Sequence, residues 1–144
     1  MSKPANPVET TDTLQDQAMQ RSNTDNAPRS AIHQTLYSAD TFVQHDYLAG
    51  KNLPDITRPQ EGQINWLHFV GINDVALLKH ALEPYGIHEL VIEDILSRKQ
   101  RPKIEDYGSY VFTAAQVYHY TSTGKLHSDQ VYVIIGKDFV LSFQ

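Results

Sequence analysis

The chain has 144 residues, enough for one domain of ordinary size, and its lack of cysteine excludes disulfide frameworks, thiolate metal sites and cysteine nucleophiles. Twelve basic and seventeen acidic residues give a net charge of −5, which argues against nucleic-acid binding and favours divalent cations or a basic partner. The longest uninterrupted apolar run, residues 131–135, is much shorter than the about 20 residues of a membrane-spanning helix.

The first 30 residues differ in composition from the rest of the chain. They are rich in Ser, Thr, Asn, Gln, Asp and Pro, and they contain no aromatic residue. Such a segment buries too little apolar surface to offset the conformational entropy lost on ordering. We therefore predict a disordered polar tail over residues 1–30 and a folded domain over residues 31–144.

The folded part begins with predicted strands. Short β-branched and aromatic segments predict strands over residues 35–37 and 42–47. A connector rich in Pro and Gly follows over residues 50–62. A third strand is predicted over residues 64–70, and Gly71 ends it.

Two helices come next. In the first, apolar residues recur at steps of three and four, which places them on one helical face. These residues are Val75, Leu78, Leu82 and Tyr85. Asn73 is the expected N-cap, and Pro84 ends the helix. A second helix is predicted over residues 88–96.

The remainder is rich in β-strand signals. Strands are predicted over residues 104–107 and 110–120, followed by a hairpin of residues 130–135 and 139–143. The order β-β-β-α-α-β-β-β-β predicts a mixed α/β domain. The sequence stops at Gln144, directly after a strand and without a polar linker, so we expect the native protein to continue beyond this point.

Catalytic motifs are not found in the sequence. It lacks Gly-x-Ser-x-Gly, Gly-x-Gly-x-x-Gly, a phosphate-binding loop and His-Glu-x-x-His. His80 and Glu83 have helical spacing and could share a metal ion, although a solvent-facing pair is the simpler interpretation. We therefore expect a protein that is not an enzyme.

Glu93 and Asp94, on the second predicted helix, are the remaining candidates for chemistry. Adjacent helical residues point about 100° apart, so they cannot hold one ion from the same side. They can offer carboxylates to two ions, or to an ion shared with another surface, and Mg²⁺ is suited to such sites. From the residues alone, two exposed acids are the simpler interpretation. The basic run over residues 98–103 has three interpretations: a solvated loop, which is the simplest, a phosphate contact, or a contact with acidic residues of another subunit or of a missing C-terminal segment.

Residues 86–107 carry more information than any generic motif. Gly86-Ile-His-Glu-Leu-Val-Ile-Glu-Asp-Ile-Leu96, followed by Gln100-Arg-Pro-Lys-Ile-Glu-Asp-Tyr107, resembles the cytoplasmic domain of the CorA-type magnesium transporters. The family pattern is Gly-x-His-Pro-Leu-x-x-Glu-Asp-(Ile/Val)-Leu and then Arg-Pro-Lys-(Val/Ile)-Glu. This sequence departs from the pattern at Glu89, where the family usually has Pro. The likeness is good over residues 63–144 and loose over residues 31–62.

The resemblance implies a fold and an assembly. CorA-type proteins are homopentamers whose N-terminal domain is an α/β/α sandwich with a mixed sheet. A stalk helix and two membrane helices follow that domain, and none of these is present in this sequence. The resemblance implies a domain on the cytoplasmic face of the cell membrane that lacks its stalk segment.

The resemblance also implies a function and a metal site. In the family, intracellular Mg²⁺ binds between neighbouring cytoplasmic domains and holds the pore closed. The acids of the motif correspond to Asp94 and Glu93 here, with binding expected to be weak in the isolated domain. Two alternatives stay open: a domain of a ZntB-like zinc transporter, or a stand-alone soluble domain that binds a ligand or partner. The sequence does not decide whether the ion carried is Mg²⁺, Co²⁺ or Zn²⁺.

Overall fold

The computed structural model describes residues 30–48, 55–71 and 73–144. The tail predicted over residues 1–30 lies, apart from Ser30, outside the described residues. Within them, no helix combines the length and the apolar character needed to cross a membrane.

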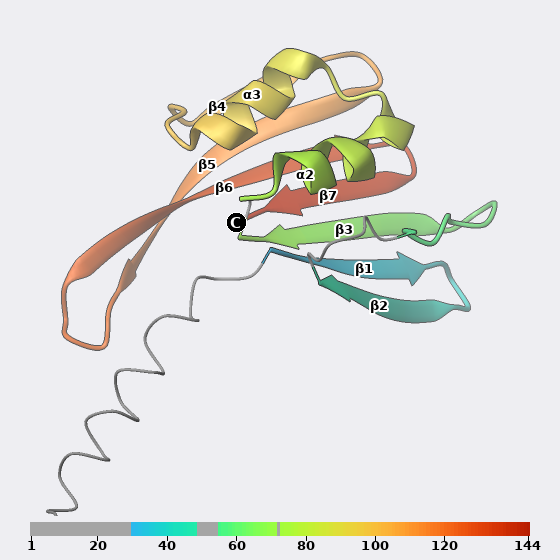
Figure 1. The fold of residues 1–144 in the computed structure, drawn as a ribbon, viewed down its shortest axis with the longest axis horizontal. Coiled ribbons are helices and arrows are strands. Elements are labelled where there is room, and N and C mark those ends of the chain that lie inside the picture. Colours follow the sequence, from blue (N-terminus) through green and yellow to red (C-terminus); the bar gives the residue numbers. More distant parts are fainter. Residues whose placement is uncertain (1–29, 49–54, 72) are drawn as a thin grey trace, which may run out of the picture.

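The described residues form seven strands, two α-helices and a short 3₁₀ helix (Figure 1). In chain order the elements are β1 (Ala31–Tyr37), β2 (Phe42–Leu48), β3 (Ile64–Val70), α2 (Val75–Leu82), η1 (Glu83–Tyr85), α3 (Glu89–Ser97), β4 (Lys103–Asp106), β5 (Tyr110–Tyr120), β6 (Leu126–Gly136) and β7 (Phe139–Phe143). The predicted order of strands and helices is therefore confirmed.

The strands form one mixed sheet in the order β2-β1-β3-β7-β6-β5-β4. Only β3 and β7 pair in parallel, with Leu67 opposite Leu141, and every other neighbouring pair is antiparallel. The segment with α2 and α3 carries the chain from β3, near the middle of the sheet, to β4 at its edge (Figure 1). The chain then returns through β5 and β6 to β7 beside β3, so the parallel pair β3 and β7 is joined by a long connection and not by a tight hairpin.

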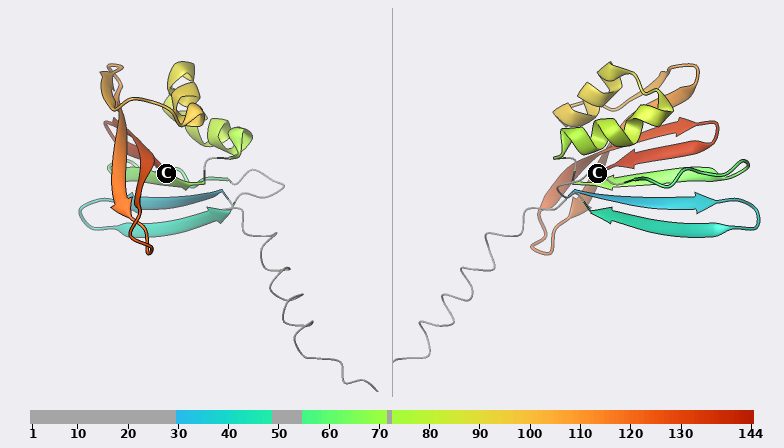
Figure 2. Two further views of the ribbon diagram at one scale, coloured as in Figure 1. Left: turned by 90° about the vertical axis from the view of Figure 1, so that its left-hand side faces the viewer. Right: turned by 45° about the vertical axis from the view of Figure 1, so that its right-hand side comes forward.

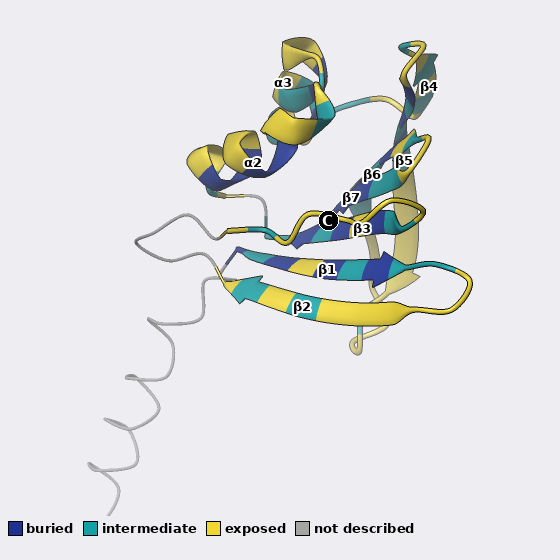
Figure 3. Ribbon diagram, turned by 90° about the vertical axis from the view of Figure 1, so that its right-hand side faces the viewer, coloured by how far each residue is buried: buried dark blue, intermediate teal, exposed yellow. Residues whose placement is uncertain are grey.

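Both helices lie on the same face of the sheet, as the two views of Figure 2 show. Burial alternates along β1 and β3, as expected for strands with one covered face (Figure 3). The mixed sheet with helices packed on it confirms the predicted fold class. The described residues supply helices to one face of the sandwich, and the opposite face carries exposed side chains such as Trp66 and Ile135.

The core lies between the helices and the sheet. The helices contribute Leu77, Leu78, Ala81, Leu82, Val91 and Ile95, and the sheet contributes residues such as Ile32, Leu67, Phe112, Tyr132, Ile134, Leu141 and Phe143. Burying a side chain of this size stabilises the fold by about 1.5–3 kcal/mol. The buried positions Val91 and Ile95 are one turn apart, so they fix which face of α3 points to solvent.

Two details of α2 differ from the sequence predictions. The N-cap is Asp74, whose carboxylate accepts a hydrogen bond from the Leu77 amide at 2.9 Å, and not Asn73. Asn73 instead accepts a hydrogen bond from the Arg98 side chain through its Oδ1. Val75, predicted on the core face, is 46% exposed because the helix is rotated so that Leu77 and Leu78 face the sheet.

Candidate metal-binding site

The candidate site is built on α3, and its local sequence explains how the helix begins. His88 has extended backbone angles, and its Nδ1 accepts a hydrogen bond from the Leu90 amide at 3.2 Å. The His88 amide itself donates to the Tyr110 hydroxyl at 3.0 Å, which ties the start of the helix to β5. Histidine thus acts as the N-cap, a position that Ser, Thr, Asp or Asn more often occupy.

Glu89 is the first residue of α3, and this position explains why the chain tolerates a departure from the family pattern. Proline is favoured at the first helical position because its missing N–H has no helical acceptor there. We therefore expect Glu89→Pro to change the free energy of unfolding by no more than about 0.5 kcal/mol. Ile92→Pro is the control. It removes an amide that donates to the His88 carbonyl and is expected to cost about 3 kcal/mol in urea unfolding. A large loss of stability in the Glu89 variant would contradict this assignment.

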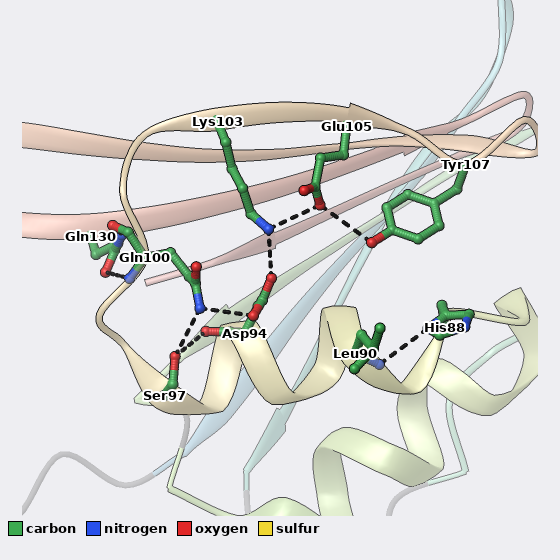
Figure 4. A network of polar contacts seen from close by, with 9 residues as sticks. All are labelled: His88, Leu90, Asp94, Ser97, Gln100, Lys103, Glu105, Tyr107 and Gln130. Atoms are coloured by element: carbon green, nitrogen blue, oxygen red, sulfur yellow. Dashed lines mark hydrogen bonds and ion pairs between the residues drawn. The ribbon is translucent and has the colours of Figure 1, made fainter.

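Asp94 lies on the side of α3 that faces β4, and its carboxylate is three-quarters buried (Figure 4). Its Oδ2 lies 2.7 Å from the Lys103 ammonium, and its Oδ1 accepts a hydrogen bond from the Gln100 side chain at 2.7 Å. The same ammonium lies 2.9 Å from Glu105 Oε2. Lys103 therefore lies between two carboxylates, one from the helix and one from β4.

The electrostatics of this cluster follow from the contacts. Hydrogen bonds to Asp94 and to Glu105 raise the pKa of Lys103 above its ordinary value, so the side chain stays charged. Tyr107 donates a hydrogen bond to Glu105 Oε2 at 3.3 Å. Burial, and then the negative charge of Glu105, raise the pKa of the Tyr107 hydroxyl, which therefore keeps its proton.

Both backbone polar groups of Gln100, its N–H and its carbonyl, bond to the side chain of Gln130. Its backbone N–H donates to Gln130 Oε1 at 3.1 Å, and its carbonyl accepts a hydrogen bond from Gln130 Nε2 (Figure 4). These two bonds anchor the segment after α3 to β6. They hold the Gln100 side chain where it can donate to Asp94.

Glu93 has a different environment. It is exposed, and its side chain forms no hydrogen bond or ion pair with another residue of the described ranges. The two adjacent acids therefore differ, because Asp94 is enclosed between α3 and β4 while Glu93 points to solvent. This matches the expectation that neighbouring helical residues cannot hold one ion from the same side.

The chemistry of the cluster fits a hard divalent cation. Asp94 and Glu105 are oxygen donors, and they already hold one positive charge between them. Mg²⁺ is bound by one or two carboxylates while keeping several waters. No group of three or more His, Asp or Glu residues capable of holding a metal ion occurs within residues 30–48, 55–71 and 73–144. A metal ion at Asp94 would therefore need water or another surface to complete its coordination.

Of the other candidate pair for a metal ion, His80 lies on α2 and Glu83 on η1. His80 and Glu83 are both exposed, in agreement with a solvent-facing pair. Within the basic run, Lys103 contacts Asp94 and Glu105 of its own chain, a pairing that none of the three interpretations of that run included. Sequence analysis identified Asp94 but not Lys103, Gln100 or Glu105 as its neighbours. The one sequence signal for these neighbours is the basic residue that begins an acidic strand in Lys103-Ile-Glu-Asp.

The chain is similar in sequence to known proteins. Residues 61–144 match the family model described as CorA-like Mg²⁺ transporter protein. The chain is 40% identical over 80 residues to the cobalt/magnesium transport protein CorA of Thermotoga maritima, covering 55% of this chain and 23% of that protein. It is 34% identical over 107 residues to the putative metal ion transporter YfjQ of Bacillus subtilis, covering 72% and 31%. The chain therefore spans less than a third of either relative.

Solved structures show the same fold. The complete CorA magnesium transporter of Methanocaldococcus jannaschii matches with a TM-score of 0.56 and 12% identity, over 78% of this chain and 31% of that chain. The soluble domain of CorA from the same organism matches with a TM-score of 0.53 and 11% identity, over 78% and 39%. At these identities the likeness establishes the architecture alone.

Proposed function

Because the chain belongs to the CorA-like Mg²⁺ transporter family, we propose that it is the cytoplasmic regulatory domain of a divalent-cation transporter. In this proposal Mg²⁺ binds at Asp94, with Glu93 contributing on the exposed side of α3, and its occupancy closes the pore. The observation that carries the proposal is the largely buried Asp94 side chain, whose carboxylate lies near that of Glu105 and already contacts a cationic group, the Lys103 ammonium.

The physical basis for regulation is charge. Five copies of a chain with a net charge of −5 repel one another, and a divalent ion between neighbouring copies relieves that repulsion. An ion that binds the closed arrangement better than the open one shifts the population towards closure. The proposed partners are therefore divalent cations, four further copies of the protein, and a stalk segment that completes each site.

The donor set also bears on which ion regulates the protein. Zn²⁺ in proteins prefers thiolate and imidazole ligands, whereas Mg²⁺ prefers oxygen. Apart from the Lys103 ammonium, the side chains bonded to one another at Asp94 are carboxylates and an amide, with no thiolate or imidazole among them, so they favour Mg²⁺ as the regulatory ion. Co²⁺ and Zn²⁺ remain candidates for the ion that a complete transporter carries.

The test is transport by the full-length protein with Asp94→Asn, measured as a function of intracellular Mg²⁺. We expect the variant to need about tenfold more Mg²⁺ for closure, because one charged contact worth about 1.4 kcal/mol is lost. Glu89→Gln, which removes an exposed acid from the same helix, is the matched control and should close at the wild-type concentration. Closure of the Asp94 variant at an unchanged Mg²⁺ concentration would refute the sensing role.

A further inference from the structure

Lys103 occupies the position at Asp94 that a metal ion would need. Its ammonium lies 2.7 Å from Asp94 Oδ2 and 2.9 Å from Glu105 Oε2, and its side chain is 27% exposed. The Gln100 amide takes the other oxygen of Asp94 at 2.7 Å. Both oxygens of the carboxylate are thus engaged by donors of the same chain, and only one of these donors carries charge.

The two donors differ in what they do to a metal ion. Gln100 is neutral and is anchored by its backbone to Gln130, so it can stay in place beside a bound ion. Lys103 carries a full positive charge, which repels a divalent ion at the same carboxylate. A lysine ammonium is a compact, hydrated charge on a flexible stem, and it can move away without breaking the backbone.

Lys103 has further partners besides Asp94. Glu105 accepts from the same ammonium, and the Lys103 Nζ lies 5.4 Å from the centroid of the Phe112 ring. When a metal ion takes Asp94, the displaced ammonium keeps its partner on β4. It is therefore not left as an unpaired charge, which would be costly at a partly buried position.

Building on the proposed function, we propose that Lys103 is a built-in competitor for the divalent cation at Asp94. In this role it sets the metal concentration to which the site responds. With no metal bound, the lysine neutralises Asp94 and holds α3 against β4. When Mg²⁺ is bound, Lys103 pairs with Glu105 alone.

The experiment measures Mg²⁺ binding to the purified full-length protein by its protection against limited chymotrypsin digestion, since trypsin would cut at Lys103 itself. Lys103→Met keeps the length of the side chain and removes its charge, and Lys103→Gln is a second neutral variant. We expect both to reach half-protection at about fivefold lower Mg²⁺ than the wild type. Lys103→Arg keeps the charge and should stay near the wild type. Lys125→Met removes the same charge at the turn between β5 and β6, far from α3, and should also leave the midpoint unchanged (Figure 1).

Combining Lys103→Met with Asp94→Asn separates the two proposals. If Asp94→Asn alone leaves the midpoint unchanged, the proposed metal site is wrong. If Asp94→Asn weakens protection while the neutral Lys103 variants behave like the wild type, the site stands and the competitor role is wrong. A gain in affinity on removing Lys103 that persists in the Asp94→Asn background would also overturn the proposal, because the effect would then not act through Asp94.

Discussion

Replacing Phe112 by alanine is expected to lower the free energy of unfolding by about 3–5 kcal/mol, the usual cost of emptying a buried aromatic site. Phe112 is fully buried near the start of β5, and its ring stacks against Tyr132 with centroids 6.1 Å apart. Neighbouring side chains relax only partly into such a cavity. The measurement is urea unfolding followed by circular dichroism, with the slope of the transition checked for two-state behaviour.

The control for this prediction lies on the same strand. Val117→Ala also shortens an apolar side chain of β5, but Val117 is 48% exposed, so its loss should cost less than about 1 kcal/mol. Phe112→Leu restores most of the volume while removing the ring that faces Lys103, and it should recover much of the lost stability. Equal effects of the Phe112 and Val117 alanine variants would contradict the assigned core.

The same ring links the core to the candidate site. Phe112 pairs directly with Glu105 across β5 and β4, and the Lys103 ammonium lies over its ring. A cation over an aromatic face gains about 0.5–1 kcal/mol at exposed positions. Loss of the ring therefore removes part of the support beneath the ion pairs with Asp94.

Local patterns predicted most of the fold. The spacing of apolar residues predicts both helices and the β-rich second half, because helical and extended periodicities are properties of neighbouring residues. The rotation of α2 that exposes Val75 was missed. It depends on how the helix packs against the sheet, which no local pattern records.

The candidate site was likewise predicted only in the part that local sequence records. Glu93 and Asp94 were found because they are adjacent and lie in a recognisable motif. The environment of Asp94 was not found, since Lys103 reaches it only when the chain returns from α3 into β4. The difference in exposure between the two acids likewise follows from the burial of Val91 and Ile95 against the sheet.

The second large loss of stability is expected from a change in a buried polar cluster beside the core. The Asn65 amide donates to the Tyr85 hydroxyl, and its Oδ1 accepts from Gln34 Nε2 at 2.9 Å. Asn65 and Gln34 are each only 1% exposed. Gln34 also donates to the Thr57 carbonyl at 2.6 Å and accepts from the Tyr47 hydroxyl at 3.0 Å. Through these bonds the cluster ties β1, β3, η1 and the connector before β3 together.

Asn65→Ala is expected to lower the free energy of unfolding by about 1–3 kcal/mol, because it leaves a buried donor of Gln34 without its acceptor. Gln44→Ala, which truncates an exposed amide on the neighbouring strand β2, should change it by no more than about 0.5 kcal/mol in the same urea titration. Similar losses in the two variants would show that the buried network contributes nothing beyond an ordinary surface contact.

Tyr85→Phe gives an independent test of the same network through its pH dependence. Burial raises the pKa of the Tyr85 hydroxyl above its ordinary value of 10.0, so the folded state holds this proton more tightly than the unfolded state. Stability from this source is complete below pH 10 and is lost as the pH rises towards the raised pKa. The wild type should therefore lose more stability than Tyr85→Phe between pH 9.5 and 11, a window that brackets the ordinary tyrosine pKa of about 10. Equal losses in both proteins would place the titrating group elsewhere, because phenylalanine has no proton to release.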